Sequence, residues 1–221
     1  MNLLDKRFPN IYSERSRLYT KSLEKKAFFE ERLVREGSSV YREWEPKRSK
    51  LGAGLVKKIS QIGIKEGSIV LYLGASHGYT PSFVSDIIGN DGFMFAIDFA
   101  PEVTRDLVLL AEQKKNIAPI LADCNHPEDY KDLVKEKVDI VFQDIAQRHQ
   151  VEIFLKNCVK YLKDGGFGLL ALKSRSIDVT KNPKEIYRQV RAQLEQTMVV
   201  VDYRELDPFE RAHALFVVKK K

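Results

Sequence analysis

The stretch Leu71-Tyr-Leu-Gly-Ala-Ser-His-Gly-Tyr-Thr80 places a glycine-containing turn directly after an apolar run. Its Gly-x-Ser-x-Gly spacing, from Gly74 to Gly78, is the one that exposes a nucleophilic serine in α/β-hydrolases. The same stretch also suits a cofactor loop, because glycines let the backbone turn tightly beside a ligand. The surrounding sequence has to decide between these two kinds of site.

Short apolar runs alternate with amphipathic segments from Ile69 onward. Such alternation is typical of parallel strands joined by crossover helices, so we predict an α/β fold. The predicted strands are Ile69 to Leu73, Phe93 to Asp98, Ile117 to Leu121, Val138 to Gln143 and Phe167 to Leu172. The predicted helices are Pro81 to Ile88, Pro101 to Gln113, Val151 to Leu162 and Pro183 to Leu194, and Lys163-Asp-Gly-Gly166 separates the third helix from the fifth strand.

The two ends of the chain have other patterns. Met198 to Leu206 and Arg211 to Val218 are separated by too few residues for a helical crossover, which predicts an antiparallel hairpin. Near the amino end, short segments such as Asn10 to Ser16 and Arg17 to Ser22 predict a small antiparallel sheet. We therefore expect a small β-rich domain over residues 1–45 and a larger domain over residues 46–221.

A carboxylate favours the cofactor reading of the glycine loop. Asp98 ends the next predicted strand, at a spacing that suits a side chain gripping ribose hydroxyls. The loop lacks the complete Gly-x-Gly-x-x-Gly of dinucleotide sites, whereas S-adenosylmethionine carries no phosphate and needs no such loop. A hydrolase could use Ser76, Asp207 and His213 as its catalytic triad. In the α/β-hydrolase fold, however, several strands precede the nucleophile, whereas only weakly patterned sequence precedes Ser76 here. Loop, carboxylate and hairpin together resemble the Class I methyltransferase fold, with a mostly parallel seven-stranded sheet.

Charge and composition restrict the class of protein. Residues 1–50 hold 13 Lys and Arg against 8 Asp and Glu, whereas the rest holds 24 against 23. A basic amino end suits contact with RNA, although a solvated basic surface explains it equally well. Cys124 and Cys158 suggest buried free thiols and no metal site. No apolar run approaches the ~20 residues of a membrane helix, so we expect a cytoplasmic protein without a membrane partner.

A specific motif narrows the assignment. The segment Tyr41-Arg-Glu-Trp-Glu-Pro-Lys-Arg-Ser-Lys-Leu51 resembles the Tyr-Arg-x-Trp-x-Pro-x-Arg-Ser-Lys-Leu signature of fibrillarins. The resemblance extends from about residue 40 to the end, and without a Gly/Arg-rich leader the chain resembles the archaeal type. Further matching motifs are Tyr72-Leu-Gly-Ala-Ser76, Val84-Ser-Asp-Ile87, Asp144-Ile-Ala-Gln147, Lys173-Ser-Arg-Ser-Ile-Asp178 and Asp207-Pro-Phe-Glu-Arg-Ala-His-Ala214.

This resemblance implies an activity and a set of partners. The activity is guide-RNA-directed 2′-O-methylation of ribosomal and transfer RNA, with S-adenosylmethionine as methyl donor. The partners are a box C/D guide RNA, a Nop-domain scaffold protein and a kink-turn-binding ribosomal-type protein. The alternative is a non-catalytic structural subunit of an RNA-processing ribonucleoprotein, against which the complete set of catalytic residues argues.

The resemblance also implies site residues. The catalytic set is Lys50, Asp144, Lys173 and His213. The cofactor set is Gly74, Ala75, Tyr79, Thr80, Asp98, Phe99, Asp123, Cys124, Asp144, Ile145, Ala146 and Gln147, and the proposed RNA contacts are Lys47, Arg48 and Arg175. Each catalytic residue also has a structural alternative: a solvated charge for Lys50, a helix cap for Asp144, a snorkelling strand end for Lys173 and a satisfied sheet histidine for His213.

Several positions depart from the family pattern. Asp98 stands where the family commonly has Glu, His77 and Tyr79 replace smaller residues, and Cys124 replaces Ala. Ala212 replaces an acidic residue beside the predicted catalytic histidine. We expect the shorter Asp98 to reach a ribose if the backbone lies closer to it. The loss of the acid beside His213 leaves the orientation of this histidine open. Lys173 is the predicted residue for positioning the hydroxyl or managing its proton.

Overall fold

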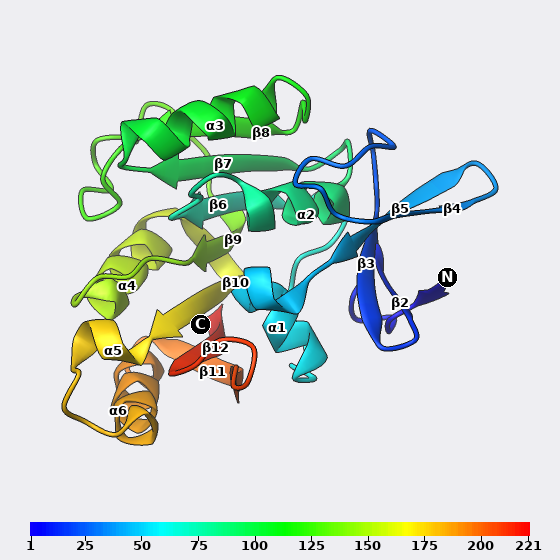
Figure 1. The fold of residues 1–221 in the computed structure, drawn as a ribbon. Coiled ribbons are helices and arrows are strands. Elements are labelled where there is room, and N and C mark those ends of the chain that lie inside the picture. The colour runs from blue at the N-terminus through cyan, green and yellow to red at the C-terminus, as the bar shows by residue number, and fades with distance from the viewer.

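The computed structural model describes residues 1–221 and contains two sheets (Figure 1). The larger sheet has seven strands in the order β11-β12-β10-β9-β6-β7-β8. Strands β6 to β10 run parallel, so their carboxyl ends meet at one edge. Their bounds are β6 (Ile69–Leu73), β7 (Phe93–Asp98), β8 (Ile117–Leu121), β9 (Val138–Gln143) and β10 (Leu162–Lys173).

The sequence predicted β6 to β9 with these bounds and placed the start of β10 too late. Helix α4 (Gln150–Tyr161) ends immediately before β10, whose first residue, Leu162, already pairs with Val138. The glycines of Lys163–Gly166 produce a register shift inside the strand instead of a turn before it. Gly165 has a φ of +73°, which a residue with a side chain rarely adopts.

The core follows from the period of two along the buried strands. Val70 and Tyr72 of β6 point to one face, and Leu71 and Leu73 point to the other. Each face packs into its own hydrophobic cluster, one of 29 and one of 25 buried residues. A sheet buried on both faces explains why these strands are nearly continuous runs of apolar residues.

Helices cover both faces of the sheet. Helices α1 (Lys50–Val56), α2 (Tyr79–Ile88) and α3 (Pro101–Ala111) contribute to the first cluster, whereas α4 and α6 (Pro183–Glu195) contribute to the second. Proline at the first position starts α3 and α6, where its missing N–H costs nothing. Helix α2 begins at Tyr79 instead of the predicted Pro81, and α5 (Ser174–Ile177) directly follows β10. None of the helices combines the length and apolar character needed to span a bilayer.

The predicted hairpin is confirmed. Strands β11 (Met198–Glu205) and β12 (His213–Lys220) are antiparallel, and β12 also pairs antiparallel with β10. In that second pairing His213 lies opposite Lys173. The hairpin thereby brings two predicted catalytic residues to neighbouring positions at the edge where the parallel strands end.

The predicted amino-terminal sheet is also confirmed. It has five antiparallel strands in the order β1-β2-β3-β5-β4 and lies beside α2 (Figure 1). The division into domains at residues 1–45 and 46–221 stays a prediction. Buried residues of both sheets share one hydrophobic cluster. The strands are β1 (Asn2–Leu3), β2 (Ile11–Glu14), β3 (Arg17–Lys21), β4 (Leu33–Glu36) and β5 (Ser39–Trp44).

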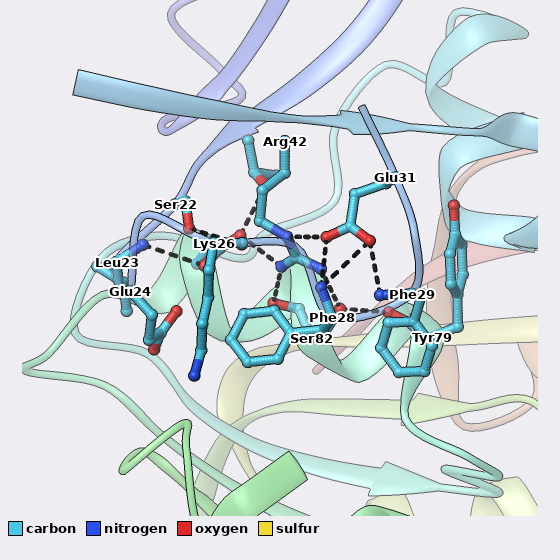
Figure 2. Close-up of polar contacts among 12 residues, drawn as sticks. Ser22, Leu23, Glu24, Lys26, Phe28, Phe29, Glu31, Arg42, Tyr79 and Ser82 are labelled. Atoms are coloured by element: carbon cyan, nitrogen blue, oxygen red, sulfur yellow. Dashed lines mark hydrogen bonds and ion pairs between the residues drawn. The ribbon is translucent and has the colours of Figure 1, made fainter. Parts of the chain in front are cut away.

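A buried network of charges joins the amino-terminal sheet to α2. Arg42 of β5 is fully buried, and its guanidinium donates to Glu31 at 2.5 Å (Figure 2). It also donates to Asp86 at 2.8 Å. Lys114, also fully buried, donates to Asp86 at 2.7 Å and to Glu24 at 2.8 Å. Two buried cations therefore face three carboxylates, which makes their burial tolerable.

Aromatic rings complete the same junction. The Phe28 ring centroid lies 4.9 Å from both the Arg42 guanidinium and the Lys114 ammonium. Trp44, at the end of β5, stacks on Phe83 of α2 with ring centroids 4.9 Å apart. The junction therefore combines charge pairing with cation–π contact and apolar burial.

Asp86→Asn tests the buried network. The substitution keeps the side-chain shape but leaves the two buried cations with only the Glu31 and Glu24 carboxylates. We expect the free energy of unfolding to fall by about 3–5 kcal/mol, the usual cost of breaking a buried pair. Urea denaturation measures this change. Arg191→Ala, which breaks the exposed Arg191–Glu195 pair, is the control and should have little effect; an equally small effect of Asp86→Asn would contradict the role of the network.

Candidate active site

The parallel strands end at two adjoining cavities. The first has a volume of about 340 Å³ and the second about 540 Å³. Gly74, Ser76 and Asp144 line both cavities, so the two form one elongated depression. Ligand sites in open α/β sheets lie outside the carboxyl ends of the strands, as this depression does.

Most of the predicted cofactor residues line the first cavity. They are Gly74, Asp98, Phe99, Cys124, Asp144, Ile145, Ala146 and Gln147. Sequence reasoning missed Ser76, Ile97 and Ala122, which also line it. The sequence carries a signal for all three, because Ile97 and Ala122 adjoin predicted cofactor residues and Ser76 belongs to the glycine loop.

The glycine loop is shaped by contact with the loop after β9. Gly74 has a φ of +80°, and a Cβ at this position would lie 2.4 Å from the carbonyl oxygen of Asp144. Any other residue would therefore push the two loops apart. The Ser76 N–H donates to Asp98 at 2.8 Å, and the Ala100 N–H donates to the other oxygen of Asp98 at 3.1 Å. The Asp98 carboxylate thus holds the loop and still faces the cavity.

Asp123 contributes to the first cavity indirectly. Its carboxylate accepts from the backbone and side chain of Asn125, each at 2.9 Å. Asn125 in turn donates to the side chain of Gln147 at 2.9 Å. Asp123 is absent from the lining and braces the loop that carries Gln147.

The remaining predicted cofactor residues, Ala75, Tyr79 and Thr80, line the second cavity. The Tyr79 hydroxyl accepts from the Glu45 N–H at 3.2 Å, and the Arg48 guanidinium lies 4.2 Å from the centre of its ring. The Thr80 hydroxyl donates to Ser49 at 3.0 Å. These contacts join the start of α2 to the segment that leads into α1.

Ser49 positions Lys50. Its hydroxyl accepts from the Gly52 N–H at 3.2 Å and so caps α1, of which Lys50 is the first residue. The Lys50 ammonium lies 2.9 Å from one oxygen of Asp144 and 3.2 Å from the other. Lys50 is therefore paired across the depression instead of being one charge in a solvated run. Asp144 does not cap a helix, because α4 begins later, at Gln150.

The ion pair determines the charge state of Lys50. Burial disfavours the ammonium, but the neighbouring Asp144 carboxylate outweighs burial and raises the pKa of Lys50 above its usual value. Lys50 is consequently a fixed cation near neutral pH. Lys173 differs, because its side chain makes no hydrogen bond or ion pair; only its backbone is bonded, to Gln150.

His213 has an orienting partner in place of the acid that Ala212 replaces. Its Nδ1 lies 2.8 Å from the carbonyl oxygen of Arg211, which requires the proton on Nδ1 and leaves Nε2 free as an acceptor. Glu210 lies farther away, at 3.8 Å. Burial, together with the charge of Lys50, lowers the pKa of His213. The neutral imidazole is therefore favoured at pH 7.

The hydrolase reading fails on geometry. A triad needs the histidine between an acid and the serine. His213 is bonded to the Arg211 carbonyl and not to Asp207, and the Ser76 hydroxyl makes no hydrogen bond. Ser76 uses only its backbone N–H, toward Asp98.

The predicted RNA contacts are exposed side chains on two elements. Lys47 and Arg48 belong to a short 3-10 helix (Pro46–Arg48), and Arg175 belongs to α5. Arg48 also donates to the Phe29 carbonyl at 3.1 Å, and Arg175 donates to the Val179 carbonyl. The two arginines are thus bonded to backbone carbonyls, and all three side chains remain exposed cations.

The two cysteines are free and buried. Burial raises the pKa of Cys124 to about 12 and raises the pKa of Cys158 as well. Neither thiol is therefore ionised at neutral pH, and Cys124 contributes an apolar surface to the first cavity.

Comparison with known proteins finds relatives over the whole length of the chain. The family model described as Fibrillarin matches residues 4–221. The fibrillarin-like rRNA/tRNA 2′-O-methyltransferase of Thermococcus sibiricus is 45% identical over 226 residues, covering 100% of both chains.

Solved structures agree with the sequence matches. Fibrillarin of Aeropyrum pernix, in complex with natively bound S-adenosyl-L-methionine, has a TM-score of 0.88 and 40% identity, covering 97% of this chain and 96% of the other. A fibrillarin/Nop5p complex contains a chain with a TM-score of 0.88 and 35% identity, covering 96% of this chain and 98% of that one.

The electrostatics of the depression predict how His213 titrates. With its pKa below the ordinary 6.5, His213 contributes stability above about pH 6.5 that is lost as the pH falls toward the folded-state pKa. We expect NMR titration of the ring to give a pKa below 6.5. Lys50→Met should move it upward, because a nearby positive charge is removed. Lys156→Met, on the exposed side of α4, is the matched control and should not move it. A value of 6.5 or more in the unaltered protein would contradict the described environment.

Proposed function

The chain belongs to the fibrillarin family, and on this premise we propose that it methylates ribose 2′-hydroxyls of ribosomal and transfer RNA. The observation that carries the proposal is the Lys50–Asp144 pair, held at the junction of two cavities, with Lys173 and His213 opposite each other on adjacent strands. These are the four residues that the family resemblance selects. The proposal includes the cytoplasmic location expected from the sequence.

The first cavity suits the adenosine part of S-adenosylmethionine. Asp98 presents carboxylate oxygens for the ribose hydroxyls, and Phe99 and Ile145 offer apolar surfaces for the adenine. The contact that leaves no room for a Cβ at Gly74 keeps the backbone close to the ligand. Asp123 and Gln147 fix the loop on the far side through Asn125. Ala75, Tyr79 and Thr80 place the methionine end toward the second cavity.

The second cavity suits the target nucleotide, because Lys50 and Asp144 line it. S-adenosylmethionine supplies an electrophilic methyl group on a sulfonium. The protein aligns the ribose oxygen with that carbon, and alignment accounts for most of what an enzyme has to provide in such a displacement. Lys50 holds Asp144 in place. The unpaired Lys173 side chain, which lines neither cavity, is proposed to reach the 2′-hydroxyl oxygen from the adjoining strand end.

The proton leaves after the new O–C bond forms. In the proposed displacement the O–C bond forms as the S–C bond of the sulfonium breaks, and the sulfur leaves as a neutral thioether. The former hydroxyl proton then passes from the ether oxygen to Asp144 or to water. Before this step the Asp144 carboxylate is paired with the Lys50 ammonium. Neutral His213 accepts a hydrogen bond at Nε2 and orients the nucleotide.

Target selection is proposed to reside in a box C/D guide RNA. The 2′-hydroxyl distinguishes RNA from DNA but carries no sequence information, so base pairing has to supply the choice of nucleotide. Lys47, Arg48 and Arg175 are proposed to contact RNA phosphates. Because a family member forms a complex with Nop5p, we propose docking to a Nop-domain scaffold. A kink-turn-binding ribosomal-type protein completes the proposed particle.

Lys173→Ala tests the catalytic assignment. We expect methyl transfer in a reconstituted guide-RNA complex to fall by about 10²-fold or more, because the group that holds the hydroxyl oxygen is lost. Affinity for S-adenosylmethionine should stay within a few-fold, since Lys173 does not line the first cavity. Lys156→Ala is the control. A Lys173→Ala complex that transfers methyl at the unaltered rate would remove this lysine from catalysis, and a fully assembled unaltered complex without activity would support the structural-subunit alternative.

Asp98→Ala tests the cofactor site. A ligand at 100 times its dissociation constant stabilises a folded protein by ~2.7 kcal/mol, so S-adenosylmethionine should raise the midpoint of thermal unfolding. Asp98→Ala should reduce that shift, because the ribose loses its acceptor and the Ser76 N–H loses its partner. NAD is the ligand control. An undiminished shift in Asp98→Ala would place the cofactor elsewhere.

A further inference from the structure

A buried glutamine lies behind the proposed catalytic lysine. Gln150 is the first residue of α4, and its side chain is fully buried. The side-chain carbonyl oxygen of Gln150 accepts a hydrogen bond from the Lys173 N–H at 3.0 Å. The amide nitrogen donates to the Lys173 carbonyl at 3.0 Å and also to the Gln147 carbonyl at 2.9 Å. One side chain thus bonds both backbone groups of Lys173.

These bonds take the place of strand pairing at the end of β10. The pairing of β10 with β9 ends at Leu170 opposite Gln143, before Lys173 is reached. On its other side Lys173 remains opposite His213 of β12. Without Gln150 the backbone of Lys173 would lack hydrogen bonds on one edge, and a strand end bonded on one edge frays. Gln150 therefore extends the support of β10 to its last residue.

Gln150 also contacts the cofactor loop. Gln147, whose carbonyl accepts from Gln150, lines the first cavity. Gln150 is itself held by Gln143, whose side-chain nitrogen donates to the Gln150 backbone carbonyl at 2.6 Å. The same buried amide is consequently bonded to the wall of the cofactor cavity and to the strand end that carries the lysine.

We infer that Gln150 is a positioning residue that holds Lys173 at a defined distance from the cofactor loop. The inference rests on the proposed function, because it acts through Lys173. Its physical basis is that a misplacement of about 1 Å in an alignment-dependent reaction costs about 10²-fold in rate. Glutamine is required at this position because two carbonyls need donors while one N–H needs an acceptor. Glutamate would keep the acceptor and remove both donors.

Gln150→Glu and Gln150→Met test the inference in the reconstituted guide-RNA complex. We expect kcat for methyl transfer to fall about 10- to 100-fold, with KM for S-adenosylmethionine within a few-fold of the unaltered value. The matched control is Asn116→Asp. Asn116 is a buried amide that donates to the Ser85 and Gly89 carbonyls and accepts from the Ser85 hydroxyl, far from the carboxyl ends of the strands. It should lose stability but keep kcat in the folded protein.

Hydrogen exchange gives a second measurement, which does not depend on methyl transfer. The Lys173 amide should be protected in the unaltered chain and should lose protection in Gln150→Met, while the amides of Leu169 and Leu170 stay protected. An unprotected Lys173 amide in the unaltered chain would overturn the inference even if no variant folds.

Lys173→Ala, measured in parallel, distinguishes failure of the positioning role of Gln150 from failure of the proposed function. If Lys173→Ala is inactive while folded Gln150 variants keep the unaltered kcat, the positioning role is wrong and the proposed function stands. If Lys173→Ala retains activity, the catalytic assignment fails and the inference fails with it. A lowered kcat in the Gln150 variants and an unaltered kcat in Asn116→Asp support positioning over a general loss of stability.

Discussion

The pairing of Arg42 with Asp86 is the constraint on which the arrangement of this molecule depends. A guanidinium without exposure to solvent is tolerable only while its carboxylates stay in place, so β5 and α2 have a single relative position. Strand β5 leads through Glu45 and the short 3-10 helix (Pro46–Arg48) to Lys50. Fixing the strand therefore fixes the start of α1, and with it the lysine that reaches Asp144. A contact remote from the depression thus determines where one of its charges lies.

Both cavities are assembled from loops that brace one another. Gly74 lies against Asp144, Ser76 is bonded to Asp98, and Asn125 joins Asp123 to Gln147. Each loop follows a different strand, so the parallel sheet supplies the spacing and the side chains supply the final positions. Loops held in this way need little rearrangement when a ligand binds, which lowers the entropic cost of binding. The depression is better described as preformed than as closing around its ligands.

The sequence was sufficient for elements whose pattern is local. Buried parallel strands read as apolar runs, and β6 to β9 were predicted residue by residue for that reason. The four predicted catalytic residues came from the family resemblance and not from periodicity. Burial of Arg42 and Lys114 could not be predicted, because isolated charges indicate surface and their partners lie 44 and 28 residues away. Side-chain direction was equally inaccessible: Tyr79 turns toward Arg48, and Asp123 turns toward Asn125 and away from the cavity.

The stacking of Trp44 on Phe83 places the indole between several parts of the fold. Trp44 is the single tryptophan of the chain, and it is fully buried where the amino-terminal sheet meets α2. Its indole N–H has no hydrogen-bond partner, and a Cβ added at Gly52 of α1 would lie 3.2 Å from it. The chromophore therefore touches the sheet, α2 and the helix that carries Lys50. Its emission is an optical reporter, built into the chain, of whether these three parts remain together when a ligand or a partner binds.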